Sequence, residues 1–366
     1  MFLRKTDRRL RKCLILAPSG QVGGGMGRVK DYIISSNREF EGVAFEHVNT
    51  RDDRGVVFSV FLTLGALSRI LRAAVSERSG TLIHANVGDR GSVLRKGALI
   101  TFARILSLPV VLHLHSAELQ RGYQSKSAIY KICARIAFAM SNMIIVLGDG
   151  TKAWLIKDLK IFPDNIVVLR NGVAVSVASK PLDVARGERV EVLFLGNLIP
   201  RKGVSELLAA VASLKEMPQR WKLTLAGGGE IERYQAEARL LGVEQLVQFT
   251  GWLGQAAASE LVASADILVL PSFDEGLPLV ILEALGSWTA VVCTPVGSIP
   301  EVLTDGENAR FVPVGDSAHL SDVLKALIND REARERLAAA GRTLYEEKFS
   351  LSRFAQALAA IYRQVI

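Results

Sequence analysis

The sequence predicts an α/β protein of two domains, each built on a doubly wound parallel sheet. Three observations predict this architecture. The chain has 366 residues, enough for two domains of about 180 residues, each with its own core. Short apolar runs bounded by turn residues alternate with helical patterns along both halves, which is typical of βαβ units. Each half also opens in the same way, with an apolar run, a loop containing glycine and a helix.

The first domain is expected at residues 1–175. Its first strand, at 12–17, is followed by the loop PSGQVGGGMG, in which Gly24 and Gly25 lack a Cβ and let the backbone approach a ligand closely. This loop fits the dinucleotide pattern Gly-x-Gly-x-x-Gly only loosely, and no acidic residue follows at the NAD spacing, so no NAD site is expected. Further strands are expected at 44–48, 81–85, 109–114, 143–147 and 166–169.

The second domain is expected at residues 186–349. The stretch 174–190 has few large apolar groups and is interpreted as the linker between the domains. The strands of this domain are expected at 190–197, 222–226, 246–249, 266–270, 290–293 and 310–312.

Composition indicates a globular protein of a reducing compartment. The three cysteines, Cys13, Cys133 and Cys293, are scattered and lie in or beside apolar runs, so buried thiols are expected. The N-terminus shows no long apolar region or small-residue cleavage site, so no secretory signal is expected. The apolar stretch 55–68 is shorter than the ~20 residues that span a bilayer, so no span is expected.

Charge is distributed unevenly along the chain. Residues 1–175 contain 26 Lys and Arg against 13 Asp and Glu, whereas residues 176–366 contain 19 against 24. The basic half indicates either an anionic membrane surface as partner or a solvated basic face; nucleic acid is not expected, because aromatics are not interleaved. The amphipathic stretch 56–75, with Arg69 and Arg72 opposite its apolar face, is either a packed surface helix or a membrane-facing element.

The stretch PSFDEGLPLVILEALGSWTAVVCTPVG combines a strand end, an acidic loop, a helix and a second strand. Pro278 suits the first position of that helix, which places Glu275 in the preceding loop and Glu283 just over one turn inside. The backbone N–H groups from Gly276 and Leu277 onward would face a ligand, and the helix dipole favours an anion such as a diphosphate. The alternative is an ordinary loop with two surface glutamates.

A second strand end carries fixed cations. In GNLIPRKG, Gly196 ends the strand, and Arg201 and Lys202 lie where the loop enters a helix. Arginine can bind phosphate through two hydrogen bonds and lysine as a point charge, so this turn is a candidate phosphate site.

Two further groups of side chains lie near strand ends of the first domain. His113 and His115 share one face of a strand, where they either contact a substrate or are hydrogen-bonded; no third metal ligand is apparent, so no metal is expected. Arg90, Arg95 and Lys96 in DRGSVLRKG either bind a phosphate of an acceptor or form a solvated helix start.

These motifs resemble a known family. The spacing of Glu275 and Glu283, with Gly-x-Pro and Leu-Glu-Ala between and around them, resembles the E-x7-E motif of retaining glycosyltransferases of family 4. The motifs GNLIPRKG, NGV and HLHSAE follow that family's order, so the resemblance covers nearly the whole chain. It implies the GT-B fold, two Rossmann-like domains facing across a cleft, with the helix at 350–366 crossing back to the first domain.

The resemblance also implies roles for single residues. Glu275 would face the donor sugar, Glu283 the nucleotide ribose, and His115 the sugar from the first domain. Trp252 either packs near the base or lies in the core. The implied catalytic residues are Glu275, His115, Arg201 and Lys202, and the implied donor-binding residues are Gly24, Gly25, Asn171, Gly196, Gly276, Leu277, Pro278 and Glu283.

The function that follows is retaining transfer of a sugar from a nucleotide diphosphate sugar, without metal or cofactor. The expected acceptor is lipid-linked or a polysaccharide or oligosaccharide, in cell-envelope or exopolysaccharide synthesis. The expected location is cytoplasmic, peripheral on the inner face of the plasma membrane. A nucleotide-sugar epimerase of the same architecture and a non-catalytic nucleotide- or membrane-binding relative are the alternatives, and sugar release from a panel of nucleotide sugars would separate the three.

Overall fold

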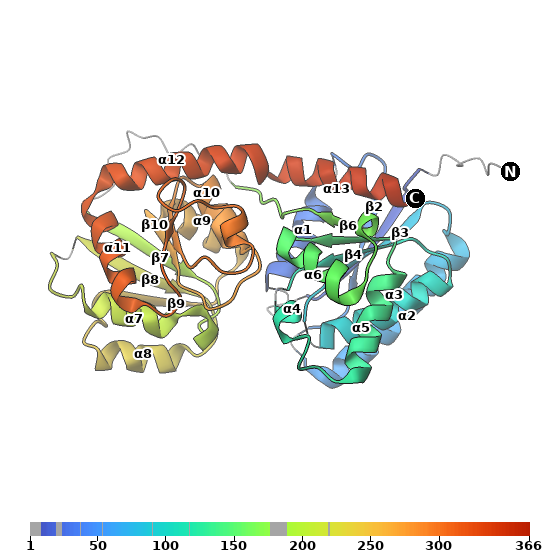
Figure 1. The fold of residues 1–366 in the computed structure, drawn as a ribbon, viewed down its shortest axis with the longest axis horizontal. Helices are drawn as coiled ribbons and strands as arrows, with labels where there is room; N and C mark the ends of the chain where they lie inside the picture. Colours follow the sequence, from blue (N-terminus) through green and yellow to red (C-terminus); the bar gives the residue numbers. More distant parts are fainter. Residues whose placement is uncertain are drawn as a thin grey trace. The chain divides into compact units, whose positions relative to one another are not determined.

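A computed structural model shows two compact α/β units (Figure 1). It describes residues 9–19, 24–36, 38–52, 54–89, 91–116, 118–175, 189–218 and 220–366. The first unit consists of Met1–Gly172 with Leu351–Ile366, and the second of Val173–Ser350. The second unit begins at Val173, whereas the second domain was expected to begin at residue 186, and most of the expected linker lies outside the described residues.

The first unit contains a six-stranded sheet with the order β2-β1-β3-β4-β5-β6, in which all neighbours are parallel. The order reverses at β1, which has β2 on one side and β3 on the other. Loops after β1 and β3 therefore diverge at the carboxyl edge, where ligands bind in such sheets. The strands are β1 (Lys12–Ala17), β2 (Ala44–Asn49), β3 (Thr81–Val87), β4 (Val110–Leu114), β5 (Met143–Val146) and β6 (Ile166–Val168).

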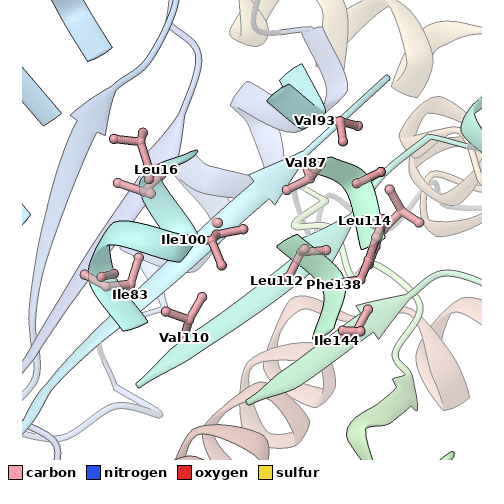
Figure 2. Packing of buried hydrophobic residues seen from close by; sticks show 14 of the residues in the cluster. Leu16, Ile83, Val87, Val93, Ile100, Val110, Leu112, Leu114, Phe138 and Ile144 are labelled. Carbon is pink, nitrogen blue, oxygen red and sulfur yellow. The ribbon is translucent and has the colours of Figure 1, made fainter. Parts of the chain in front are cut away.

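The two faces of this sheet differ in chemistry. On one face, alternate strand residues such as Ile83 and Leu112 pack against Ile70, Ile100 and Phe138 of the covering helices, in one apolar cluster (Figure 2). The helices of the unit are α1 (Gly24–Ser35), α2 (Val56–Ser76), α3 (Gly91–Ile105), α4 (Glu118–Gly122), α5 (Ala128–Met140), α6 (Asp149–Leu159) and α13 (Leu351–Val365).

The opposite face carries polar side chains from the same central strands. Because side chains alternate along a strand, His84 on β3 and His113 on β4 point away from the apolar cluster. Both are fully buried, and α13 covers them: Phe354 stacks on His113 with ring centroids 6.5 Å apart, and the Tyr362 hydroxyl lies 2.8 Å from His84 Nδ1. The last helix thus belongs to the core of the first unit.

The second unit repeats the plan with a six-stranded parallel sheet in the order β12-β11-β10-β7-β8-β9. Here the order reverses at β7, between β8 and β10. The strands are β7 (Val190–Leu195), β8 (Trp221–Ala226), β9 (Val247–Gly251), β10 (Ile267–Leu270), β11 (Ala290–Cys293) and β12 (Arg310–Phe311). The helices are α7 (Val204–Ala212), α8 (Ile231–Leu240), α9 (Gln255–Ser264), α10 (Leu279–Gly286), α11 (Ser317–Asn329) and α12 (Arg331–Lys348).

Each predicted strand is present, and the doubly wound prediction is confirmed for both units. The start of α10 differs by one residue from the prediction. Pro278 has φ −65° and ψ 130°, so it is the extended N-cap and Leu279 is the first helical residue. All eight residues of α10 are buried, which explains its apolar sequence LVILEALG.

Glycine at position 203 is required by a close approach between two loops. Gly203 has φ +70°, and a Cβ there would lie 2.1 Å from the carbonyl oxygen of Pro271. Gly242 has nearly the same φ, +68°, but nothing lies within 4 Å of its Cβ position. We predict that Gly242→Ala lowers the free energy of unfolding by only ~1–2 kcal/mol, the cost of a left-handed non-glycine residue.

Gly203→Ala should lower the free energy of unfolding by clearly more than this matched control, since the loops must also separate. Urea unfolding of both variants measures the difference. Equal losses would contradict the close approach.

Candidate active site

The centre of the candidate site in the second unit is an ion pair between the loops after β7 and β10. Lys202 Nζ lies 2.5 Å from Glu275 Oε1, and the two side chains are 15% and 9% exposed. The pair stands where the strand order reverses, at the carboxyl edge of β7 and β10. Removing one partner of such a buried pair costs about 3–5 kcal/mol, because the other charge is left uncompensated.

A second contact, made by Arg201, joins the same two loops. Arg201 donates from a guanidinium nitrogen to the backbone oxygen of Asp274 at 2.5 Å, and its own carbonyl accepts from Phe273 N–H at 2.9 Å. Arg201 and Lys202, predicted to bind phosphate, are therefore fixed beside the Glu275 loop. The structure brings these three predicted catalytic residues together.

The loop after β11 supports the Glu275 loop from its other side. A Cβ at Gly297, whose φ is +59°, would lie 1.9 Å from the carbonyl oxygen of Glu275. Ser298 N–H donates to the carbonyl oxygen of Gly276 at 3.0 Å, and the Thr294 hydroxyl donates to the carbonyl oxygen of Ser272 at 2.5 Å. The Glu275 backbone is thus held by neighbours on two sides.

The start of α10 offers backbone donors next to this pair. The N–H groups of Gly276, Leu277 and Leu279 make no hydrogen bond within the part of the chain that the structure describes. A helix start of this kind can bind an anion. Glu283 lies one turn further on and is only 3% exposed, so the prediction of an ordinary surface glutamate is wrong for it.

Glycines line the neighbouring strand ends. A Cβ at Gly227 would lie 1.9 Å from the carbonyl oxygen of Gly196, so the loops after β7 and β8 touch through backbone. Trp252 follows β9 and is 55% exposed, with its Cβ 3.9 Å from the Cβ position of Gly228. Of the two alternatives for Trp252, the core tryptophan is therefore wrong, and the exposed ring is available to a base.

In the first unit, His115 follows β4 and is partly exposed. Its Nε2 lies 3.0 Å from Asn86 Oδ1, and the same oxygen lies 3.0 Å from Nε2 of His84. Burial lowers the pKa of His115, and the nearby His84 and Lys96 lower it further. His115 is therefore neutral at physiological pH.

His113 lies between the other two histidines. Its ring centroid is 3.9 Å from that of His115 and 5.4 Å from that of His84, and neither ring nitrogen has a hydrogen-bond partner among the described residues. Burial and the two neighbouring imidazoles hold the pKa of His113 well below its usual range. His113 thus packs as a neutral ring, which explains a residue to which the motifs assign no role.

The structure corrects the expectation for Lys96. Lys96 is 1% exposed and donates to the backbone oxygen of Asn86, so an acceptor phosphate does not reach it from solvent. Burial lowers the pKa of Lys96 to about 7. Arg95 is half-buried. Burial is the main cause that lowers its pKa, and the charge of Arg51 is the second, so the two guanidinium groups are near each other. Arg90 lies outside the described residues.

The predicted donor contacts of the first unit lie at strand ends. Gly24 and Gly25 begin α1 after β1, are exposed, and have nothing within 4 Å of their Cβ positions. Gly24 has φ +45°, a backbone conformation that itself favours glycine, whereas neither conformation nor packing explains Gly25, and close approach of a ligand would. Asn171 follows β6, is 3% exposed, and its Oδ1 has no partner among the described residues.

Sequence reasoning missed His84, Asn86 and Tyr362. A usable signal exists for the first two, because IHAN on β3 and HLH on β4 both place polar residues at alternate positions of neighbouring strands. Tyr362 has no such signal, since 278 residues separate it from His84. Within the described part of the chain, no group of three or more histidine, cysteine or acidic residues could hold a metal ion.

Comparisons with known proteins agree with this geometry. A profile described as "Glycosyl transferases group 1" matches residues 182–344. D-inositol 3-phosphate glycosyltransferase of Corynebacterium efficiens is 29% identical over 95% of this chain and 93% of its own length. Residues 182–344 thus match the group 1 glycosyltransferases, and nearly the whole chain is similar to a named glycosyltransferase.

A further relative and a solved structure are also similar to this chain. Phosphatidyl-myo-inositol mannosyltransferase of Mycobacterium leprae is 33% identical over 54% of this chain and 52% of its own length. The Anabaena HepE structure in complex with UDP-glucose has a TM-score of 0.74 and 19% identity, covering 96% of this chain and 99% of that one, which shows the GT-B fold. The enzyme transfers a sugar from a nucleotide-sugar donor.

The buried histidines predict a loss of stability in mild acid. Burial lowers the pKa of His84 to about 4, so the unfolded chain, with an ordinary histidine pKa, takes up a proton that the folded enzyme does not. The stability contributed by neutral His84 is full above about pH 6.5 and falls as the pH drops toward 4. Between pH 7.5 and 5 the free energy of unfolding should fall by about 2 kcal/mol for this group.

Urea unfolding across this range measures the effect. His84→Gln should reduce the pH-dependent loss by the share of this one group, since the lowered pKa values of His113 and His115 maintain the rest, whereas the exposed control His319→Gln should leave the full loss. A wild-type stability that is independent of pH down to 5 would contradict burial of neutral histidines.

Proposed function

We propose that the enzyme transfers a hexose from a nucleotide diphosphate sugar to a lipid-linked acceptor or growing polysaccharide, with retention of the anomeric configuration and without a metal ion. The observation that carries the chemistry is the pair of Lys202 and Glu275 beside Arg201, at the reversal point of the second sheet. The closed set of hydrogen bonds around the Glu275 loop supports a preorganised site.

Departure of the nucleotide diphosphate leaves negative charge that needs stabilisation where it develops. Arg201 and Lys202 supply positive charge, and the N–H groups at the start of α10 supply donors. The ammonium of Lys202 has three N–H donors, so it can contact a phosphate oxygen while it stays beside Glu275. These groups would perform the role that a divalent cation performs in other transferases.

The proposed role of Glu275 is to position the donor sugar and stabilise positive charge at the anomeric carbon. Its partner Lys202 holds the carboxylate in place through an ion pair whose two side chains are largely buried. Glu283, buried on α10, would bind the nucleotide ribose, and the exposed Trp252 would contact the base. In the first domain, His115 and Gly25 are the residues proposed to contact a sugar donor. The UDP-glucose in HepE makes a UDP-sugar the first donor to test.

We expect Glu275→Gln to lower turnover at least tenfold, while the dissociation constant of the nucleoside diphosphate changes little. The amide keeps the shape of the side chain but removes the charge that faces the sugar, and ~1.4 kcal/mol corresponds to tenfold. Product NMR should show the donor's anomeric configuration, and EDTA should not reduce the rate.

The exposed Glu307→Gln is the matched control and should behave as the wild type. An inverted product, or full turnover by Glu275→Gln, would overturn the mechanism. Loss of activity in EDTA that is restored by a divalent cation would overturn the metal-free proposal alone.

An apolar surface on the first domain supports a membrane-held acceptor. This outer face consists of α2 and α5 with the neighbouring α3, and its exposed members include Val57 at 76%, Phe61 at 64% and Ile129 at 75%. The other large exposed apolar side chains of these helices are Val60, Leu64, Leu71, Val75, Leu94, Ile105, Ile132 and Ile136. Large exposed apolar patches mark sites of contact with proteins or membranes.

The charge of the outer face fits an anionic lipid surface. None of α2, α3 and α5 contains Asp or Glu, whereas Arg69, Arg72, Lys131 and Arg135 lie among the apolar residues. The segment Val57–Ser76 is long and apolar enough to cross a bilayer, which the predicted limit at residue 68 missed. However, Ala66, Ile70 and Ala73 belong to the sheet core, so α2 would lie along the membrane surface.

This surface supports the proposed location on the cytoplasmic side of a membrane and a lipid-linked acceptor. The relative from Mycobacterium leprae, named as a phosphatidyl-myo-inositol mannosyltransferase, has an acceptor of that class in its name. Arg95 remains the proposed contact for an anionic group of the acceptor, because a second guanidinium, that of Arg51, lies close to it. Cell-envelope or exopolysaccharide synthesis is the proposed setting.

We predict that the enzyme binds vesicles containing anionic lipid and that binding weakens with salt, because exposed charges are screened within about 8 Å at physiological ionic strength. Val57→Glu combined with Phe61→Glu should abolish retention, since two carboxylates would replace apolar contacts. Leu240→Glu on α8, where the leucine is 88% exposed, is the matched control and should leave binding unchanged. Vesicle flotation measures all three proteins, and no wild-type retention at low salt would exclude the membrane as partner.

A further inference from the structure

We infer that Asn86 is a positioning residue that locks His115 as the neutral Nε2–H tautomer, so that Nδ1 of His115 can only accept a hydrogen bond from the bound sugar. The sugar must then present a hydroxyl to His115, and a deoxy, fluoro or O-methyl group at that position is disfavoured. This inference rests on the proposed contact between His115 and the donor.

The hydrogen bonds that determine the tautomer begin at Tyr362 on helix α13. Cys13 Sγ lies 3.9 Å from the Tyr362 hydroxyl oxygen and donates to it, so the tyrosine proton is directed elsewhere. Its only other partner among the described residues is His84 Nδ1, at 2.8 Å. Burial raises the pKa of both Cys13 and Tyr362, so both groups keep their protons. Tyr362 therefore donates to His84, and Nδ1 of His84 is the acceptor.

The second step passes through Asn86. Because Nδ1 of neutral His84 accepts, its proton is on Nε2, which lies 3.0 Å from Asn86 Oδ1. The side-chain oxygen of Asn86 is thereby assigned as the atom that faces both rings. His115 Nε2, also 3.0 Å from this oxygen, must then donate as well. One amide oxygen accepts from two histidines, and both have the same tautomer.

The surroundings also exclude the doubly protonated form of His115. The charged or titratable groups that face it are His84 from the neighbouring β3, His113 from β4, which His115 itself follows, and Lys96 from α3. Lys96 donates to the backbone oxygen of the same Asn86, so its ammonium lies beside the cluster. No carboxylate balances the charge of this group among the described contacts. A proton on Nδ1 of His115 would add a second positive charge there.

The remaining nitrogen of His115 is available to a ligand. Nδ1 has no hydrogen bond among the described residues, and the ring is partly exposed, unlike the buried His113 and His84. A neutral acceptor nitrogen matches a sugar O–H. A site built for such a hydrogen bond rejects an analogue without the donor, because its acceptor loses water and gains no partner.

Nitrogen-15 NMR of the histidine rings tests the tautomer without any substrate. We expect His115 and His84 in the wild type to show the Nε2–H pattern from about pH 5 to 8, in contrast to the mixture that a free imidazole shows. Asn86→Ala should release His115 to a mixture of tautomers, while the signals of His47, which contacts Ala17 instead, stay in place. An Nδ1–H pattern for His115 in the wild type would overturn the inference.

A panel of deoxy and fluoro donor sugars tests the consequence. In the wild type, one position of the sugar should lose about tenfold or more in kcat/KM when its hydroxyl is removed. The ratio of kcat/KM between the complete donor and the donor without that hydroxyl should fall toward one in Asn86→Ala, while the affinity for the nucleoside diphosphate stays unchanged. Tyr362→Phe should lower the same ratio partly. Asn86→Ala with an unchanged ratio would refute the positioning role.

The two experiments separate this inference from the proposed function. If the enzyme transfers no sugar from any nucleotide donor, the proposed function fails, but the tautomer measured by NMR is unaffected. If transfer occurs and no single hydroxyl matters in the wild type, the inference fails alone.

Discussion

The organisation of the second domain depends on one ion pair between two loops. Lys202 and Glu275 lie in the loops after β7 and β10, and both side chains are largely buried. Two such charges are stable there only if the loops hold them at hydrogen-bond distance. The loops therefore approach one another through backbone, and glycine is required at 203 and 297, where a Cβ would strike a carbonyl oxygen. The proposed function would use these two charges in the positions in which the loops already hold them.

In the first domain, the two faces of one sheet bury different kinds of side chain. Its apolar face packs against α2, α3 and α5, whereas its other face buries imidazole and amide groups under α13. Buried imidazoles are tolerated because they are neutral and, for His84 and His115, hydrogen-bonded through Asn86. The end of the chain, through Phe354 and Tyr362, completes this polar layer. The layer links the last helix to the residue that would contact the donor.

The helix α2 faces two apolar environments at once. Its inner residues, such as Ile70, enter the sheet core, while Val57 and Phe61 point outward. This arrangement explains why the helix is apolar around most of its circumference, a pattern that periodicity alone assigns to a buried helix or a span. The absence of carboxylates from α2, α3 and α5 gives the outward face its basic character. A membrane surface satisfies both properties.

The sequence by itself determined the strands of the two parallel sheets, and it marked Arg201, Lys202, Glu275 and Glu283 as candidate site residues, because alternating apolar runs and motif spacing are local properties. It did not determine which of these residues touch, or that Trp252 is exposed and Lys96 buried. Those facts depend on contacts across long separations: 73 residues between Lys202 and Glu275, and 278 between His84 and Tyr362. Burial and pairing are properties of the packed chain, so only the tertiary structure decided them.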